Sequence, residues 1–156
     1  MKLKENKDRV GNVIKIKLNE DNSGLARVIG GSFLEFYDVL LSDAQSNFDC
    51  ASITQHNVTF TLSVHKSWTK NSGWQLIGSN TNAIPNPPRQ FMQGIGNPND
   101  IKIVDPTDGI YPATRQQVEL EGLERVAVWE DSHIEDRLRD HFSGKPNVWM
   151  DQLKLK

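Results

Sequence analysis

The chain has 156 residues, which suits one domain with its own hydrophobic core. Its 20 acidic and 18 basic residues nearly balance, so the global charge does not favour a nucleic-acid ligand. Cys50 is the one cysteine, which excludes an intrachain disulfide framework and a cysteine-based zinc site. The sequence shows neither a signal-peptide core nor an apolar run long enough to span a membrane. We therefore expect a cytoplasmic protein with a single domain over 1–156, in which 1–10 is a flexible or edge segment.

Strand patterns dominate the first part of the chain. Apolar and polar residues alternate over 14–18, which is the two-residue period of a half-buried strand. Turn-forming residues at 19–24 and at 30–31 allow the chain to reverse direction twice. The pattern predicts a three-stranded antiparallel meander, with strands at 14–18, 25–29 and 33–41.

Further strands are predicted toward the middle of the chain. The clearest alternation of apolar and polar residues lies at 58–64, and shorter strands are indicated at 74–77 and 101–104. Four prolines interrupt the region between the last two strands. Because proline cannot serve a central strand, we expect 80–99 to be a loop.

The last third of the chain changes character. A helical turn is predicted at 114–120, and a short buried strand at 126–128. Glu135 follows Ser132 at the spacing of a capping box, so we expect a helix to begin at Ser132.

Apolar residues mark the buried face of this second helix. Ile134, Leu138 and Phe142 recur at four-residue spacing. Gly144 stands where a helix commonly ends, and a last short helix is predicted at 147–153.

Strands that come first and helices that come late predict an α+β fold. We expect a mostly antiparallel twisted sheet or a partial β-barrel, with C-terminal helices packed on it. Five residues are the candidates for its structural core: Trp74, Trp129, Phe60, Ile134 and Leu138.

Candidate catalytic chemistry is sparse. His133 and His141 lie eight residues apart on one predicted helix, about 12 Å along its axis, so they cannot bind one metal ion together. His56 and His65 flank the predicted strand, which favours exposed strand-end histidines over a metal pair. No base is predicted beside Cys50, so a buried or incidental thiol is favoured over a nucleophile. We expect no catalytic residue, no metal ligand and no cofactor.

Charge is distributed unevenly along the chain. The segment 1–17 holds six basic and two acidic residues, whereas 119–140 holds eight acidic and three basic residues. Two interpretations of the acidic stretch stay open. It is either a solvated helix face supported by i,i+4 ion pairs or a docking surface for a basic partner.

Seven short motifs follow one another along the chain. They are GNVIKIKL at 11–18, ARV at 26–28, FYD at 36–38, GWQLIG at 73–78, PPRQF at 87–91, VAVW at 126–129 and IEDRL at 134–138. In this order they resemble the immunity protein 26 family of bacterial polymorphic toxin systems. The resemblance spans Gly11 to Leu153.

This resemblance implies an α+β immunity protein whose partner is a cognate toxin domain, which it binds and blocks without catalysis. Combined with the charge layout, it makes Glu130, Asp131, Glu135 and Asp136 candidate contacts with the toxin. Arg89, beside two prolines in the predicted loop, is a fifth candidate.

Two alternative functions remain open. Some relatives carry a phosphotriesterase label, which implies a small metal-dependent hydrolase and calls for several converging ligands. Nucleic-acid binding through the lysine-rich amino terminus ranks last, because the net charge is −2.

Overall fold

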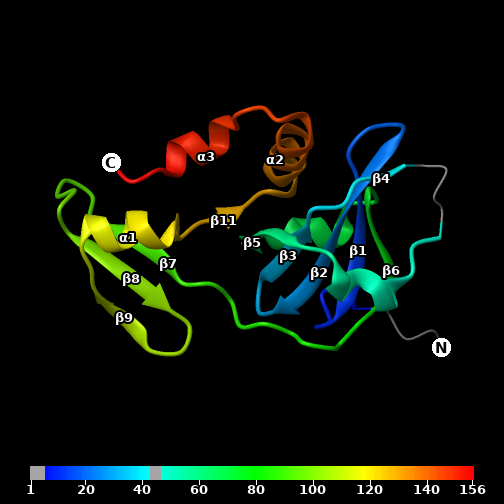
Figure 1. The fold of residues 1–156 in the computed structure, drawn as a ribbon, viewed down its shortest axis with the longest axis horizontal. Coiled ribbons are helices and arrows are strands. Elements are labelled where there is room, and N and C mark those ends of the chain that lie inside the picture. Colours follow the sequence, from blue (N-terminus) through cyan, green and yellow to red (C-terminus); the bar gives the residue numbers. More distant parts are fainter. Residues whose placement is uncertain (1–5, 43–46) are drawn as a thin grey trace.

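The structure, a computed structural model, describes residues 6–42 and 47–156 and shows two β-sheets side by side along the long axis of the molecule (Figure 1). Part of the predicted amino-terminal segment, 1–5, lies outside the described residues. The chain passes from the first sheet to the second through 80–89 and returns through 126–127.

Within the described residues, seven strands form the first sheet, in the order β11-β5-β3-β2-β1-β6 with β4 on β2. All of its pairings are antiparallel except that of β5 with β11. The strands are β1 (Asn12–Lys17), β2 (Asn22–Gly30), β3 (Phe33–Tyr37), β4 (Leu41–Ser42), β5 (Val58–Val64), β6 (Trp74–Ser79) and β11 (Val128–Trp129).

The second sheet has the order β10-β7-β8-β9, in which β10 runs parallel to β7 and the other pairs are antiparallel. Its strands are β7 (Gln90–Gln93), β8 (Ile101–Asp105), β9 (Gly109–Pro112) and β10 (Glu124–Arg125). The helix α1 packs on it through Val118, which joins Phe91 and Ile101 in a small separate core.

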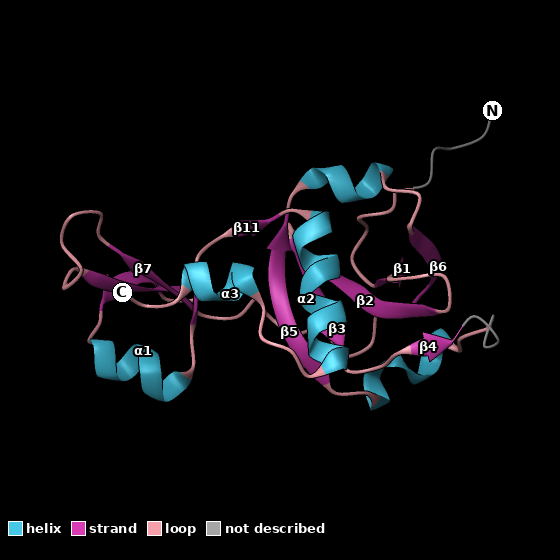
Figure 2. Cartoon of the chain, turned by 90° about the horizontal axis from the view of Figure 1, so that it is seen from above, coloured by secondary structure: helices cyan, strands magenta, loops and turns pink. Residues whose placement is uncertain are grey.

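The α-helices cover one face of each sheet and bridge the two. Figure 2 shows α2 lying along the first sheet and α3 between the two sheets. The helices are α1 (Arg115–Glu121), α2 (Asp131–Ser143), α3 (Val148–Leu153) and the 3-10 helices η1 (Cys50–Gln55) and η2 (Lys66–Lys70).

The main core lies between α2 and the first sheet. Ile134 and Leu138 have no exposed surface, and Phe142 packs at the edge of the same cluster, as the four-residue spacing predicts. Gly144 caps the helix in a left-handed conformation, with φ 67°, which confirms the predicted helix end.

The opposite face of the first sheet is covered only in part. Val13, Leu25 and Tyr37 pack there against Ile53 of η1. The backbone at 80–83 covers a neighbouring area, because buried Arg27 binds carbonyl oxygens in this segment.

Two predicted local structures are wrong. The helix α2 begins at Asp131 with Glu130 at its N-cap position and no side-chain cap, so Ser132 does not begin a capping box with Glu135. The carboxylate of Glu135 accepts hydrogen bonds from Asn71 and Trp74 instead. The loop predicted over 80–99 contains β7, which starts just beyond the last of the clustered prolines and gains ladder bonds from two strands.

The segment 126–128 also differs from its prediction as a buried strand. The strand β11 consists of Val128 and Trp129, and only Trp129 is buried. Val126 and Val128 are 42% and 65% exposed. The reason is that β11 is an end strand with a covering helix on one side only.

The α+β prediction is confirmed, with a mostly antiparallel sheet and helices late in the chain. No closed barrel forms among the described residues. The five core candidates are all buried, from 0% exposure for Trp74 to 7% for Phe60. A single domain stays a prediction.

Candidate functional site

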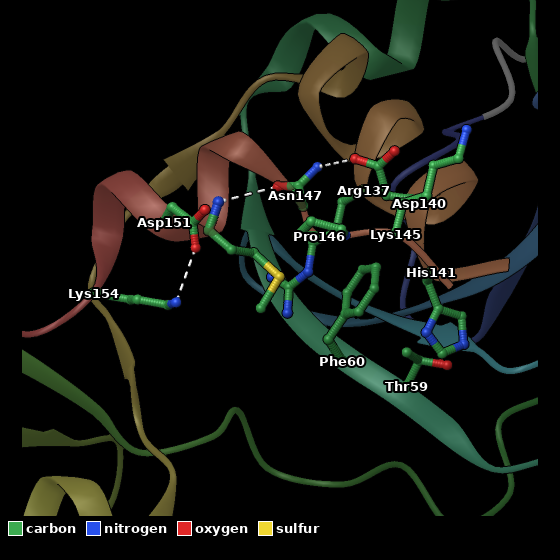
Figure 3. A pocket seen from close by; sticks show the side chains of 11 residues that line it. Thr59, Phe60, Arg137, Asp140, His141, Lys145, Pro146, Asn147, Asp151 and Lys154 are labelled. Atoms are coloured by element: carbon green, nitrogen blue, oxygen red, sulfur yellow. Dashed lines mark hydrogen bonds and ion pairs between the residues drawn. The ribbon is translucent and has the colours of Figure 1, made fainter. Parts of the chain in front are cut away.

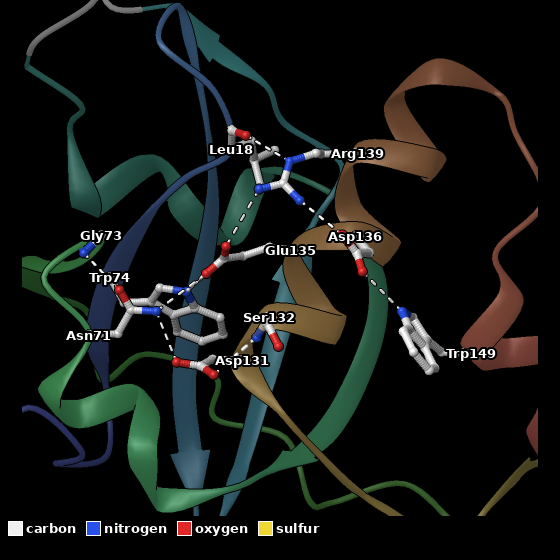
Figure 4. Close-up of polar contacts among 10 residues, drawn as sticks. All are labelled: Leu18, Asn71, Gly73, Trp74, Asp131, Ser132, Glu135, Asp136, Arg139 and Trp149. Carbon is white, nitrogen blue, oxygen red and sulfur yellow. Dashed lines mark hydrogen bonds and ion pairs between the residues drawn. The ribbon is translucent and has the colours of Figure 1, made fainter.

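The acidic residues at the start of α2 contact partners that are distant in sequence (Figure 4). Glu135 Oε2 accepts hydrogen bonds from Trp74 Nε1 at 2.8 Å and from Asn71 Nδ2 at 3.3 Å. Asp131 Oδ2 accepts from the same Asn71 amide at 2.9 Å. Because Trp74 is fully buried, its indole N–H needs an acceptor inside the protein. These two carboxylates therefore hold α2 on the first sheet.

Asp136 links α2 to its other neighbour, α3. Its Oδ2 accepts a hydrogen bond from Trp149 Nε1 at 3.0 Å, and the Trp149 ring stacks on His133 with 3.6 Å between ring centroids. Asp136 Oδ1 pairs with Arg139 Nη1 at 3.0 Å, and Arg139 Nε donates to the carbonyl of Leu18 at 2.7 Å. This set of contacts joins α3, α2 and the first sheet.

Glu130 is placed differently from the other acidic candidates. It is exposed, and its carboxylate has no hydrogen bond or ion pair with any residue that the structure describes. Asp131, Glu135 and Asp136 are each partly buried and engaged within the chain. The structure thus separates one free carboxylate from three that support the fold.

Arg89 lies in a cleft between the two sheets. Its guanidinium forms an ion pair with Glu121 of α1 and donates a hydrogen bond to the Tyr111 hydroxyl at 3.0 Å. The Arg89 side chain is 38% exposed, so it is available at the mouth of this cleft. The cleft has a volume of about 470 Å³ and is lined by Thr61, Pro88, Arg89, Glu121, Gly122, Leu123 and Glu124.

A buried arginine joins the two sheets behind this cleft. Arg137 of α2 is 5% exposed and donates from both terminal nitrogens to the Glu124 carboxylate of β10, each at 2.8 Å. Its guanidinium also lies 4.0 Å from the ring centroid of Phe60 and 5.1 Å from that of Trp129. Such a bidentate pair restricts both distance and angle, so it fixes β10 relative to α2.

A second buried arginine anchors the segment that leads to Arg89. Arg27 donates to the Glu35 carboxylate at 2.8 Å and to the carbonyls of Asn80 and Asn82 at 3.1 and 2.7 Å. Sequence reasoning missed this network. Arg27 and Glu35 are opposite charges inside strands that are otherwise apolar. Because buried charges are normally paired, this pattern could have indicated the ion pair.

A groove between β5, α2 and α3 is the other hollow of note (Figure 3). It has a volume of about 430 Å³, with Phe60 at its floor and the Lys145 amine at its rim. The other basic side chains around it already have acidic partners: Lys154 pairs with Asp151, His141 with Asp38, and Arg137 with Glu124.

The histidines do not converge. His56 and His65 lie beyond opposite ends of β5, a seven-residue strand that is roughly 23 Å long. His65 Nδ1 accepts the backbone N–H of Ser67, while His141 Nε2 lies 2.9 Å from Asp38 Oδ1. Among the described residues, no group of three or more His, Cys, Asp or Glu side chains is placed to hold a metal ion. The hydrolase alternative thus gains no support from them.

Cys50 packs against the backbone of β6. A Cβ added at Gly78 would lie 2.7 Å from Cys50 Sγ, so glycine at that position lets the thiol approach closely. Burial, followed by the charge of Asp49, raises the pKa of Cys50, which disfavours a thiolate.

Comparison with known protein families identifies the family of the chain. The family described as Immunity protein 26 matches residues 9–100, which is more than half of the 156 residues. The chain belongs to the immunity protein 26 family. The match covers the first sheet as far as β6, the linking segment and β7, and ends before α1 and α2. Searches of curated proteins and of solved structures each found no significant match.

The family motifs within the match have structural roles here. Trp74 of GWQLIG is the indole bound by Glu135, and Arg27 of ARV is the buried anchor of 80–83. Phe36 of FYD packs edge-on against Trp74, with ring centroids 6.1 Å apart. None of the helices in the described ranges has the length and apolar character needed to cross a bilayer.

Proposed function

We infer that this protein binds a cognate toxin domain and neutralises it by direct contact, without catalysis. Its membership of the immunity protein 26 family carries this proposal, because an immunity protein protects the cell that makes the toxin. Cytoplasmic action is part of the proposal. A lethal enzyme must be almost fully occupied to be harmless, so the complex should have a dissociation constant of about 1 nM or lower.

The structure refines which candidate residues we assign to the contact. Glu130 keeps this assignment because its exposed carboxylate has no partner among the described residues, and Arg89 keeps it because it lies at the mouth of the cleft. Asp131, Glu135 and Asp136 are assigned a supporting role, because their carboxylates hold Asn71, Trp74 and Trp149 in place. Reversing their charge would weaken protection mainly by damaging the fold.

Co-expression tests the function. The toxin C-terminal domain encoded by the adjacent gene should arrest growth alone and be tolerated together with this protein. An inactivated form of the same domain should co-purify with it in a fixed ratio. Protection without any stable complex would contradict neutralisation by contact, and unchanged arrest of growth would contradict the function itself.

A further inference from the structure

Exposed aliphatic side chains gather in the segment that joins the second sheet to α2. Val126 and Val128 are 42% and 65% exposed and lie two residues apart between β10 and the start of α2. Isolated exposed aliphatic residues are ordinary, but a local concentration beside a cleft marks an interaction site.

Strand pairing shows where Val128 points. Trp129 turns toward α2 and the main core, so its neighbour Val128 lies on the opposite face of the first sheet. Val128 pairs with Ser63 of β5, and Thr61 lies two residues earlier on the same face. Thr61 lines the cleft that contains Arg89, so Val128 and the cleft share one face of the sheet.

The charge of the same segment is one-sided, although arginines from outside it pair with two of its glutamates, Arg89 with Glu121 and Arg137 with Glu124. Between 119 and 130 there are four glutamates and a single basic residue, Arg125. Arg125 is turned away to the end of the chain, where its Nε donates to the carbonyl of Leu153 at 3.1 Å and its Nη2 to that of Lys154 at 3.1 Å. The carboxylates of Glu119 and Glu130 have no partner among the described residues.

We propose that the interlobe face, defined as Arg89, Val126, Val128 and Glu130 beside the cleft of about 470 Å³, is the surface that receives the toxin. Its occupant is a basic segment of the toxin domain that also carries apolar side chains. Charge complementarity identifies it: lysine or arginine would meet the unpaired carboxylate of Glu130, while aliphatic groups cover Val126 and Val128. This inference rests on the proposed function.

The rigid surroundings support this assignment. Arg137 fixes the cleft wall at Glu124, and Arg27 fixes the segment that ends at Arg89. A preformed face loses little conformational freedom when a partner binds, which favours affinity. The aliphatic centre should set the dissociation rate, and the carboxylates should set the association rate.

Surface plasmon resonance with the inactivated toxin domain from the adjacent gene tests the interlobe face. The double variant Val126→Ser/Val128→Ser should bind about tenfold more weakly, through faster dissociation. Glu130→Ala should associate several-fold more slowly at low salt, and this difference should shrink as salt is added.

Matched controls lie elsewhere on the surface. Val148 of α3 is 57% exposed, and Glu20 lies in the exposed turn after β1, so Val148→Ser and Glu20→Ala should bind within about twofold of the parent. Thermal melting checks that every variant is folded. Wild-type binding with unchanged constants for all the interlobe variants would overturn the placement alone. No binding by the wild type would overturn the placement together with the proposed function.

Discussion

Glu135 and Asp136 of α2 and the exposed Glu119 and Glu130 belong to one continuous acidic stretch, yet they occupy opposite situations. In α2, Glu135 accepts a hydrogen bond from the buried indole N–H of Trp74, and Asp136 accepts one from the half-buried Trp149. Before α2, Glu119 and Glu130 face solvent with no partner among the described residues. A run of like charges can therefore contain a structural part and an accessible part, and only the positions of the partners separate them.

The largest expected effect comes from the structural part. Glu135→Ala should lower the free energy of unfolding by about 2–3 kcal/mol, because the buried indole of Trp74 and the Asn71 amide both lose an acceptor. Glu135→Gln keeps an acceptor oxygen and should recover most of this loss. Urea denaturation measures both.

Glu130→Ala is the matched variant for this comparison. It should change the free energy of unfolding by about 0.5 kcal/mol or less, since the carboxylate contributes only a favourable charge near the helix amino terminus. Similar losses for Ala at positions 130 and 135 would remove the distinction between the two regions.

A smaller effect is expected at a third carboxylate, that of Glu35, which is buried beneath 80–83. Tyr37 donates its hydroxyl to Glu35, and burial first, then this hydrogen bond, raises the pKa of Tyr37 above its ordinary 10.0. As pH rises past about 10, tyrosine ionises in the unfolded chain before it does so in the folded protein, so stability should fall.

The variant Tyr37→Phe tests whether the Tyr37 hydroxyl causes this loss of stability. It should cost about 1 kcal/mol at neutral pH and should flatten the loss of stability above pH 10. Unfolding curves at pH 7, 9.5 and 11 measure both effects. An unaltered slope in the variant would show that Tyr37 is not the group responsible.

The sequence allowed the first sheet and the packing of α2 to be predicted, because their residues repeat at clear periods. The alternation at 58–64 and the four-residue spacing of Ile134 and Leu138 each report a local geometry directly. Much of the second sheet was harder to predict. Its strands β7 and β9 have four residues each, too few to establish a period beside several prolines and glycines.

The candidate site was predictable only as a region. Charge counts located 119–140, but the partners of Glu135 lie more than 60 residues away in sequence, and no local pattern reports them. Val126 and Val128 suit a strand equally well whether it is covered or open. Alternation shows that two faces differ, but it does not show which face another element covers.

Hydrogen–deuterium exchange of the protein alone and bound to the inactivated toxin domain tests the central claim most directly. Contact at the interlobe face predicts slower exchange across 119–130 on binding, with little change across 133–142, where α2 is already protected by the core. Protection confined to 133–142, with 119–130 unchanged, would contradict it.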